Sequence, residues 1–230
     1  MQDKTKLVDG VFTSIYKKYD LMNDVISLGY HRIIKRNALK NCQPGNLLDL
    51  AAGTGDFAIY FRKLFGDNNK IALADPNSEM LDYAKIRLAK KSINKNIEFV
   101  TCYAEKLPFN DNSFDNVTVG FGLRNFTDRP QALAEIFRVI KNNGRLIIID
   151  FSKPVNPITN VLNNFYLNNI VPILARFITE NISEYRYLAK SIKEHPNQQK
   201  ILEMMNSAGY TNCRYENKLS GIIAVHYGDK

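Results

Sequence analysis

The segment LLDLAAGTGD at positions 47–56 is the feature that most constrains how this chain can fold. A short apolar run, typical of a buried strand, passes through small residues into a stretch with helical spacing that begins at Asp56. Small residues at such a turn let backbone N–H groups approach a ligand, as in nucleotide-binding α/β folds. The segment therefore predicts a strand over 47–51, a binding loop, and a helix over 56–64.

The same alternation continues along the chain and predicts the fold class. Strands separated by helices of this length form a parallel sheet. Two final strands joined by a short loop are expected to be antiparallel. We expect strands at 70–75, 97–102, 114–121, 145–151, 210–216 and 221–227, with helices at 78–91, 131–141 and 198–208. The prediction is a doubly wound, mostly parallel, seven-stranded Rossmann-like α/β sheet with an antiparallel C-terminal strand.

The rest of the chain is interpreted as additions to one domain. With 230 residues, the length fits a single α/β domain over 1–230 with modest accessory regions. Residues 1–40 are expected to form an N-terminal helical cap, and 152–195 a helical insert. Within that insert, the mostly apolar stretch 158–178 predicts a helix that is kinked or split at Pro172.

Composition limits the cellular setting and the partners. Lys and Arg number 31 against 23 Asp and Glu, so the net charge is +8, which suits an anionic membrane surface or nucleic acid, or simply a solvated surface. The three cysteines and three histidines are scattered and no CxxC pair occurs, so we expect no metal site and no disulfide framework. Without a secretory signal in MQDKTKLVDG or a long apolar run, the sequence predicts a cytoplasmic protein.

Acidic residues around the binding loop indicate which nucleoside it takes. Asp75 ends the second predicted strand, where a carboxylate can accept from ribose hydroxyls. Asp49 and Asp56 flank the loop and would repel the pyrophosphate of NAD, whereas they suit the ammonium and sulfonium of S-adenosylmethionine (SAM). Asp56 could instead serve only as a helix cap. Taken together, the acids favour SAM.

The loop after the third predicted strand is expected to lie against the adenine. Ligands of open α/β sheets lie outside the carboxyl ends of the strands, which places residues 103–105 at that edge. Glu105 could accept a hydrogen bond from the adenine amino group, or it could be an exposed loop carboxylate. We expect the cofactor to be bound by Asp49, Gly53, Thr54, Gly55, Asp75, Tyr103, Ala104, Glu105 and Gly120.

With these residues assigned, the chain resembles class I SAM-dependent methyltransferases and, within them, the ubiquinone/menaquinone biosynthesis C-methyltransferases. The resemblance covers nearly the whole chain. It rests on YDLMNDVISLGYHR (19–32), LDLAAGTGD (48–56), AEKLPF (104–109), FGLRNFTD (121–128), DFSKP (150–154), YRYLAKSIKEHPNQ (185–198) and SGIIAVH (220–226). The first and last two of these segments lie outside the cofactor core and are the most specific.

The sequence departs from the family pattern in five places. Tyr103 stands where the family has Asn or Asp, and Gly120 where it has Ser. Ile34 replaces a Trp, Tyr227 replaces an Arg, and Asn142-Asn143-Gly144 replaces a Pro-Gly-Gly turn. None of these changes removes the cofactor loop or the expected fold.

The resemblance implies transfer of a methyl group from SAM to a ring carbon of a polyprenylated quinol, demethylmenaquinol or 2-polyprenyl-6-methoxy-benzoquinol or both. It implies that Arg124 stabilises a phenolate, that Asn125 orients a ring oxygen, and that His31 is the first candidate for the base. Arg124 could instead form a salt bridge with Asp128, and His31 a structural hydrogen bond in the cap.

The resemblance also implies partners. We expect a polyprenyl quinol as substrate, a peripheral association with the inner membrane surface, no nucleic acid, and either a homo-oligomer or a quinone-biosynthesis complex. The apolar stripe within 158–178 could pack in the core, or serve as a lid against the isoprenoid tail or the membrane. Two other functions stay open: methylation of another small molecule or RNA, and a SAM-binding subunit without catalysis.

Overall fold

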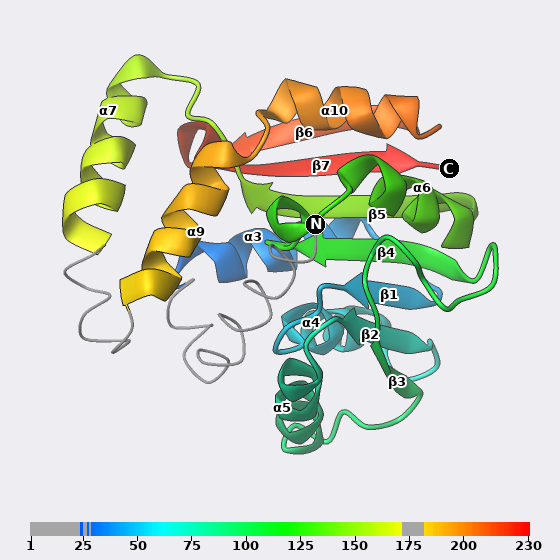
Figure 1. Cartoon of the computed structure of the whole chain (residues 1–230). Helices are drawn as coiled ribbons and strands as arrows, with labels where there is room; N and C mark the ends of the chain where they lie inside the picture. Colours follow the sequence, from blue (N-terminus) through cyan, green and yellow to red (C-terminus); the bar gives the residue numbers. More distant parts are fainter. Residues whose placement is uncertain (1–23, 25–26, 28, 172–181) are drawn as a thin grey trace.

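A mixed seven-stranded sheet forms the centre of the computed structural model, which describes residues 24, 27, 29–171 and 182–230 (Figure 1). The strand order is β3-β2-β1-β4-β5-β7-β6, and β7 runs antiparallel to both of its neighbours while the other pairs are parallel. The strands are β1 Leu47–Leu50, β2 Ile71–Asp75, β3 Ile97–Thr101, β4 Phe114–Gly120, β5 Ile140–Phe151, β6 Thr211–Lys218 and β7 Ile223–Asp229. The predicted fold class is confirmed.

Helices cover both faces of the sheet because the central strands carry apolar side chains on both sides. The helices are α3 Tyr30–Ala38, α4 Asp56–Phe65, α5 Ser78–Ala89, α6 Arg129–Val139, α7 Pro157–Phe165, α9 Ile182–Glu194 and α10 Gln198–Ser207, with short turns η1 Leu39–Asn41, η2 Leu123–Asn125, η3 Tyr166–Ile170 and η4 Leu219–Gly221. Leu47 packs in one cluster with α3, α4 and α5, and its neighbour Leu48 packs in the other with α6 and α10. This alternation produces the two-layered core that the doubly wound fold requires.

Several element boundaries differ from the prediction, and two of the differences have clear local reasons. Helix α6 begins at Arg129 rather than at 131, because Asp128 accepts from the backbone N–H of Gln131 and Pro130 occupies the first turn. Strand β5 begins at Ile140 rather than at 145, because Ile140 already pairs with Phe114 of β4. The pairing resumes at Arg145 after an irregularity that contains Asn143, whose φ is 64°. The N-terminal cap is described only for α3, η1 and the residues just before α3, so most of the predicted 1–40 segment lies outside the described residues.

The apolar stripe of the insert does not pack in the core over α7, whereas Val171, just after η3, is 1% exposed and belongs to a core cluster. Helix α7 has no buried residue, and Ile158, Val161, Leu162 and Phe165 are 58–71% exposed. They follow one another at the spacing of one helical face, and Figure 1 shows α7 standing apart from the sheet. The core-packing interpretation is therefore wrong for α7, while Pro172 and the stretch to 178 lie outside the described residues.

We expect acid to destabilise the fold through two buried histidines. His195 and His226 are each 1% exposed, and burial lowers the pKa of each to about 4. An unfolded histidine has a pKa near 6.5, so the unfolded chain gains protons as the pH falls from about 6.5 towards 4 and the native state does not. The contribution of each histidine to the free energy of unfolding is fully present above pH 6.5 and decreases as the pH falls from about 6.5 to 4. At pH 5.5 the loss is about 1.4 kcal/mol per histidine.

The measurement is urea unfolding at pH 7.5 and 5.5, for the wild type and for His195→Phe. Groups common to both proteins cancel in the comparison, so the variant should lose about 1.4 kcal/mol less than the wild type on acidification. Equal losses in the two proteins would show that His195 does not titrate in this way.

Candidate functional site

The turn between β1 and α4 lies at the carboxyl edge of the sheet, and its backbone conformation is tightly constrained. Gly53 and Gly55 have φ values of 53° and 80°, which side-chain-bearing residues rarely adopt. A Cβ on Gly55 would lie 2.8 Å from the Leu88 side chain of α5. The backbone N–H of Ala52 donates to the carbonyl of Ala74 at 3.1 Å, which fixes the turn against β2. The predicted glycine turn between β1 and α4 is therefore present, and Gly55 is required by its geometry.

Asp75 is brought to this loop, as its position at the end of β2 predicts. Its carboxylate accepts from the backbone N–H of Gly53 at 2.9 Å and from that of Asn77 at 2.9 Å. The side chain is 8% exposed, so it stands at the rim of the core. Asp75 thereby joins the glycine loop to the start of α5, whose first turn is capped by the Asn77 side chain.

Asp49 is a buried carboxyl at the base of the same loop. It is 1% exposed, and Thr118 Oγ1 donates to its Oδ1 at 3.0 Å. Among the described residues, its Oδ2 has no hydrogen-bond partner. Burial raises the pKa of Asp49 well above its ordinary value, although Thr118 acts in the opposite direction. A cationic group placed beside this carboxyl would favour its ionised form.

Asp56 does not act as the loop's second free negative charge, which corrects one part of the sequence interpretation. Lys35 Nζ lies 3.0 Å from its Oδ2 and Arg87 Nη1 lies 2.8 Å from its Oδ1. Burial alone would raise the pKa of Asp56, but these two cations outweigh it and hold the pKa below its ordinary value. The carboxylate is therefore neutralised and would repel a pyrophosphate less than the sequence alone indicates. Asp56 instead joins α3, α4 and α5.

Arg87 also fixes Thr54, because its Nη1 donates to the Thr54 carbonyl and to Oγ1, each at 3.0 Å.

Gly120, the last residue of β4, is also closely confined. A Cβ on Gly120 would lie 2.4 Å from Cε2 of Phe57, so the ring of α4 fills the space that a larger residue would need. Both predicted cofactor residues therefore stand at the carboxyl edge of the sheet.

The three predicted adenine contacts after β3 are placed differently from one another. Tyr103 is 46% exposed, whereas Ala104 is buried. Glu105 Oε1 accepts from the backbone N–H groups of Thr127 and Asp128, at 2.8 and 3.1 Å. That carboxylate therefore ties its loop to the segment before α6, a role that the sequence did not reveal.

Arg124 is buried and paired, but not with the residue expected. It is 2% exposed, and its Nη1 lies 2.9 Å from Asp150 Oδ1 while its backbone N–H donates to Oδ2 at 3.0 Å. Its Nη1 also donates to the carbonyl of Phe121. The alternative pairing with Asp128 is wrong, since Asp128 caps α6. Arg129 donates to the carbonyls of Leu123 and Arg124, at 3.1 and 2.9 Å, and completes the support of η2.

Asn125 follows Arg124 and is partly exposed at the same edge. Its Oδ1 accepts a hydrogen bond from the Tyr187 hydroxyl of α9 at 3.1 Å. Sequence reasoning missed this contact, because 62 residues separate the two side chains. The only available signal was that Tyr187 lies in the segment YRYLAKSIKEHPNQ, which is outside the cofactor core.

His31 on α3 is fully buried beside the end of β4. Its Nε2 lies 2.8 Å from Asp24 Oδ1, and Nδ1 has no hydrogen-bond partner among the described residues. The His31 and Phe121 rings meet edge to face, with centroids 6.2 Å apart. Burial, and then the charge of Lys35, lower the pKa of His31, so the ring is neutral near pH 7. The structural hydrogen bond expected as an alternative is present, and Asp24 is its acceptor.

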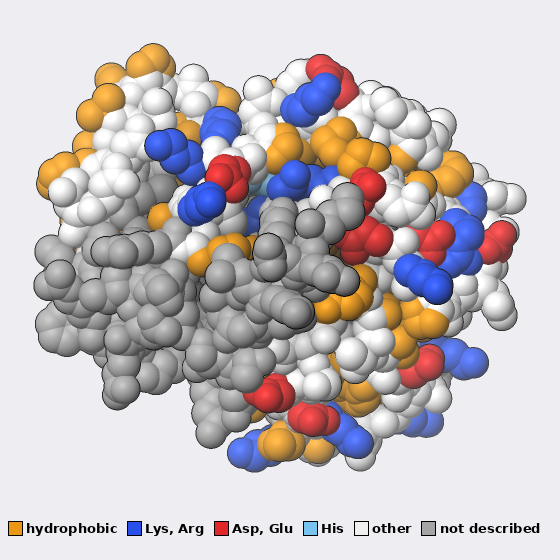
Figure 2. All heavy atoms as spheres, viewed as in Figure 1, with side chains coloured by type: hydrophobic (Ala, Val, Ile, Leu, Met, Phe, Trp, Pro, Cys, Tyr) orange, Lys and Arg blue, Asp and Glu red, His pale blue; other side chains and the backbone are white. Residues whose placement is uncertain are grey.

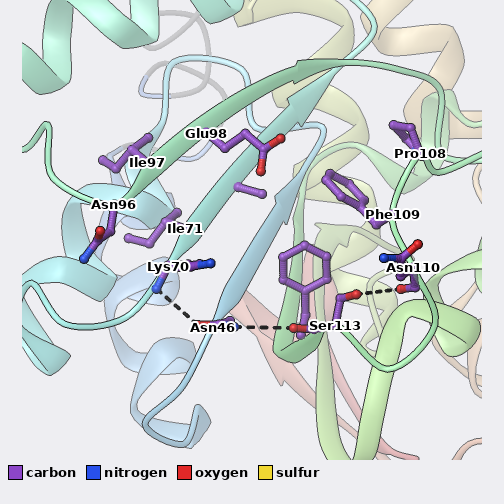
Figure 3. Close-up of a pocket in the computed structure, with 12 residues that line it drawn as sticks. Asn46, Lys70, Ile71, Asn96, Ile97, Glu98, Pro108, Phe109, Asn110 and Ser113 are labelled. Carbon is purple, nitrogen blue, oxygen red and sulfur yellow. Dashed lines mark hydrogen bonds between the residues drawn. The ribbon is translucent and has the colours of Figure 1, made fainter.

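A separate depression lies at the opposite edge of the sheet (Figure 3). Asn46, Lys70, Asn96 and Ser113, which line it, each directly precede one of the strands β1 to β4. The depression is thus at the amino ends of these strands, away from the glycine loop. Within the described part of the chain, no cluster of His, Cys, Asp or Glu is placed to hold a metal ion.

Comparisons with known proteins agree with this arrangement. The model of the ubiE/COQ5 methyltransferase family matches residues 1–230. Two relatives named ubiquinone/menaquinone biosynthesis C-methyltransferase UbiE are each 45% identical: that of Francisella tularensis subsp. novicida over 100% of this chain and 93% of its own, and that of Teredinibacter turnerae over 99% and 93%.

Solved structures share the fold at low sequence identity. A SAM-dependent methyltransferase of Thermotoga maritima, described as a possible histamine N-methyltransferase, has a TM-score of 0.67 and 19% identity over 96% of this chain and 99% of its own. A SAM-dependent methyltransferase of Aquifex aeolicus has a TM-score of 0.63 and 19% identity over 90% and 97%.

We expect the Arg124–Asp150 pair to dominate the local stability. Arg124→Met leaves the Asp150 carboxylate buried without its counter-ion and should cost about 3–5 kcal/mol of unfolding free energy. Lys200→Met is the control, because Lys200 pairs with Glu203 at 3.1 Å on an exposed surface and should cost no more than about 1 kcal/mol. Urea unfolding measures both; a loss at Arg124 as small as that at Lys200 would contradict the assignment.

Proposed function

Because the chain belongs to the ubiE/COQ5 methyltransferase family, we propose that it methylates a ring carbon of a polyprenylated quinol in ubiquinone and menaquinone biosynthesis, using SAM. The observation that carries this proposal is the 45% identity to relatives named UbiE over 100% of this chain. The match includes the cap and the insert as well as the cofactor loop. We therefore propose one methyltransferase domain over 1–230, to which the cap (1–40) and the insert (152–195) contribute.

The residues around the glycine loop fit the chemistry of SAM. The cofactor supplies an electrophilic methyl group on a sulfonium and carries an ammonium. The unpartnered Oδ2 of buried Asp49 suits a cation. The glycines keep the loop free of side chains, so a ligand can approach its backbone closely. We assign the cofactor to Asp49, Gly53, Thr54, Gly55, Asp75, Tyr103, Ala104, Glu105 and Gly120. This assignment rests on the chemistry of these residues and on their position at the carboxyl edge. It does not depend on the charge of Asp56.

The substrate carbon becomes nucleophilic when a ring hydroxyl loses its proton, so the protein must stabilise a phenolate and accept that proton. Asn125 is partly exposed at the carboxyl edge and is assigned to the ring oxygen. Arg124 is paired with Asp150, which offsets its charge, so it is assigned to stabilising the phenolate mainly by holding η2 and Asn125 in place. An arginine stays protonated, so it is assigned no base role.

His31 is assigned as the proton acceptor. Asp24 fixes the Nε2 side of the ring, and if Nε2 carries the proton, Nδ1 is the basic nitrogen. Because the pKa of His31 is lowered, the ring is neutral and able to accept a proton at physiological pH. Arg32 donates to the same Asp24 carboxylate through two hydrogen bonds, at 2.8 and 2.7 Å, and holds it in position.

The insert is assigned to the membrane that carries the substrate. The sequence has no charged residue between Lys153 and Arg176, and the α7 apolar face is exposed. In Figure 2 hydrophobic side chains gather at the α7 end, and Lys and Arg side chains, with an acidic side chain among them, lie on the surface nearby. An exposed apolar face with a basic border suits an anionic lipid surface. Among the described residues, no helix has the length and apolar character to cross a bilayer.

The proposed reaction predicts what Asn125→Ala does. Removing a donor to the developing phenolate should lower kcat by about a hundredfold or more, while the Kd for SAM changes little. The assay measures transfer of a labelled methyl group from SAM to a short-chain demethylmenaquinol or benzoquinol analogue. The control is Asn164→Ala on exposed α7, which should keep full activity.

Quinone profiling of a strain that lacks the methyltransferase, complemented with this chain, extends the same test. Methylated quinone should return with the wild type and not with Asn125→Ala. If the wild type restores no quinone and methylates neither analogue, the proposed function is wrong.

The membrane assignment predicts salt-sensitive binding to lipid. The protein should sediment with anionic vesicles at low salt and be released at about 0.5 M salt, where the screening length is about 4 Å. Neutral vesicles should bind it weakly. Ile158→Asn with Phe165→Asn should weaken binding at low salt, whereas Asn160→Ser with Asn164→Ser, on the polar side of α7, should not. Equal binding to both vesicle types at every salt concentration would contradict the assignment.

A further inference from the structure

We propose that Tyr187 of α9 is a positioning residue, which fixes the amide of Asn125 so that its NH₂ group, rather than its oxygen, faces the substrate. The starting observation is the hydrogen bond in which the Tyr187 hydroxyl donates to Asn125 Oδ1 at 3.1 Å. The two residues belong to different elements, α9 and η2, and the contact is side chain to side chain. This inference rests on the proposed function, because it concerns the ring oxygen of that substrate.

The chemistry of the amide makes its orientation decisive. An Asn side chain presents an acceptor on one side and two N–H donors on the other, and rotation about its last bond exchanges them. A phenolate only accepts hydrogen bonds, so the NH₂ group stabilises it and the carbonyl oxygen repels it. A hydroxyl that donates to Oδ1 occupies the acceptor side and leaves Nδ2 as the group available to substrate.

Tyr187 is well placed to hold the amide because α9 is anchored in the core. Leu188 and Ile192 of the same helix are 6% and 7% exposed and pack in the cluster that also contains Phe121. Tyr187 itself is partly buried. A hydroxyl on a packed helix loses little freedom when it bonds, so it specifies one geometry of its partner.

The backbone of Asn125 is held by other groups. Its N–H donates to the carbonyl of Gly122 at 2.9 Å, and Arg129 donates to the carbonyls of Leu123 and Arg124. Arg124 is fixed by Asp150. Removing the Tyr187 hydroxyl therefore changes what holds the side-chain amide and leaves the main supports of η2 intact.

The test is Tyr187→Phe, which deletes the hydroxyl and keeps the ring. We expect kcat to fall about tenfold, with KM for the quinol analogue, the Kd for SAM and the unfolding midpoint nearly unchanged. Tyr215→Phe is the matched control, since the Tyr215 ring packs against His226 on the β6–β7 side of the sheet, and it should keep full activity.

A double-mutant cycle separates positioning from a merely structural role. In the Asn125→Ala background, Tyr187→Phe should cause no further loss of kcat, because there is no amide left to orient. An equal loss in both backgrounds, or full activity of Tyr187→Phe alone, overturns the inference while the proposed function stands.

A spectroscopic measurement tests the geometry without catalysis. The ¹⁵N-labelled side-chain amide of Asn125, assigned by its disappearance in Asn125→Ala, should shift clearly in Tyr187→Phe and not in Tyr215→Phe. Unmoved signals in Tyr187→Phe overturn the inference whatever the protein methylates, whereas a wild type that methylates no quinol overturns the proposed function.

Discussion

The buried ion pair between Arg124 and Asp150 is the interaction on which the geometry of the candidate site depends. Both side chains are 2% exposed, so neither charge is solvated and each is tolerated only because of the other. Asp150 receives the guanidinium on one oxygen and the Arg124 backbone N–H on the other. The carboxyl ends of β4 and β5 are thus joined, and the next residue, Asn125, is directed outward from a fixed base.

The same pair explains an unusual backbone conformation at the end of β4. Phe121 has a φ of 60°, which a bulky residue adopts only where its surroundings compensate. Its N–H donates to the Ile149 carbonyl at 2.6 Å, and its own carbonyl accepts from Arg124. The chain can therefore turn sharply over the edge of the sheet, and the Phe121 ring lies beside His31. In this way β4, β5 and α3 converge on one place.

Much of the fold could be predicted from the sequence, because the patterns that specify each strand and helix lie within short segments of the chain. Alternating apolar runs, the glycine turn and the acids at strand ends are visible within a few residues, and Asp75 lies where the pattern predicted. The charge states were not predictable in the same way. Asp56 is neutralised by Lys35 and Arg87, which approach it from α3 and α5. Tyr187 and Asp150 reach η2 across the sheet edge, and no periodicity encodes such contacts.

Four carboxyl groups near the carboxyl edge show why residue type alone could not fix their roles. Asp56 has two cations, Asp150 has one, and Asp75 accepts from backbone N–H groups. Within the described structure, the carboxyl group of Asp49 accepts a side-chain hydrogen bond only from the Thr118 hydroxyl, and its pKa is raised. Of the four, Asp49 is therefore the one whose charge an incoming cation would change most.

The insert after β5 uses its two described halves in opposite ways. Helix α9 turns Leu188 and Ile192 into the core and places Tyr187 against Asn125, whereas α7 leaves its apolar face in solvent. Exposing such a face is unfavourable in water and is typical of an interaction surface. A substrate with a reactive ring and a long apolar tail needs both a rigid polar contact and an apolar surface nearby. In the proposed function, one insert that carries both would couple the surface that meets the tail to the residue that positions Asn125.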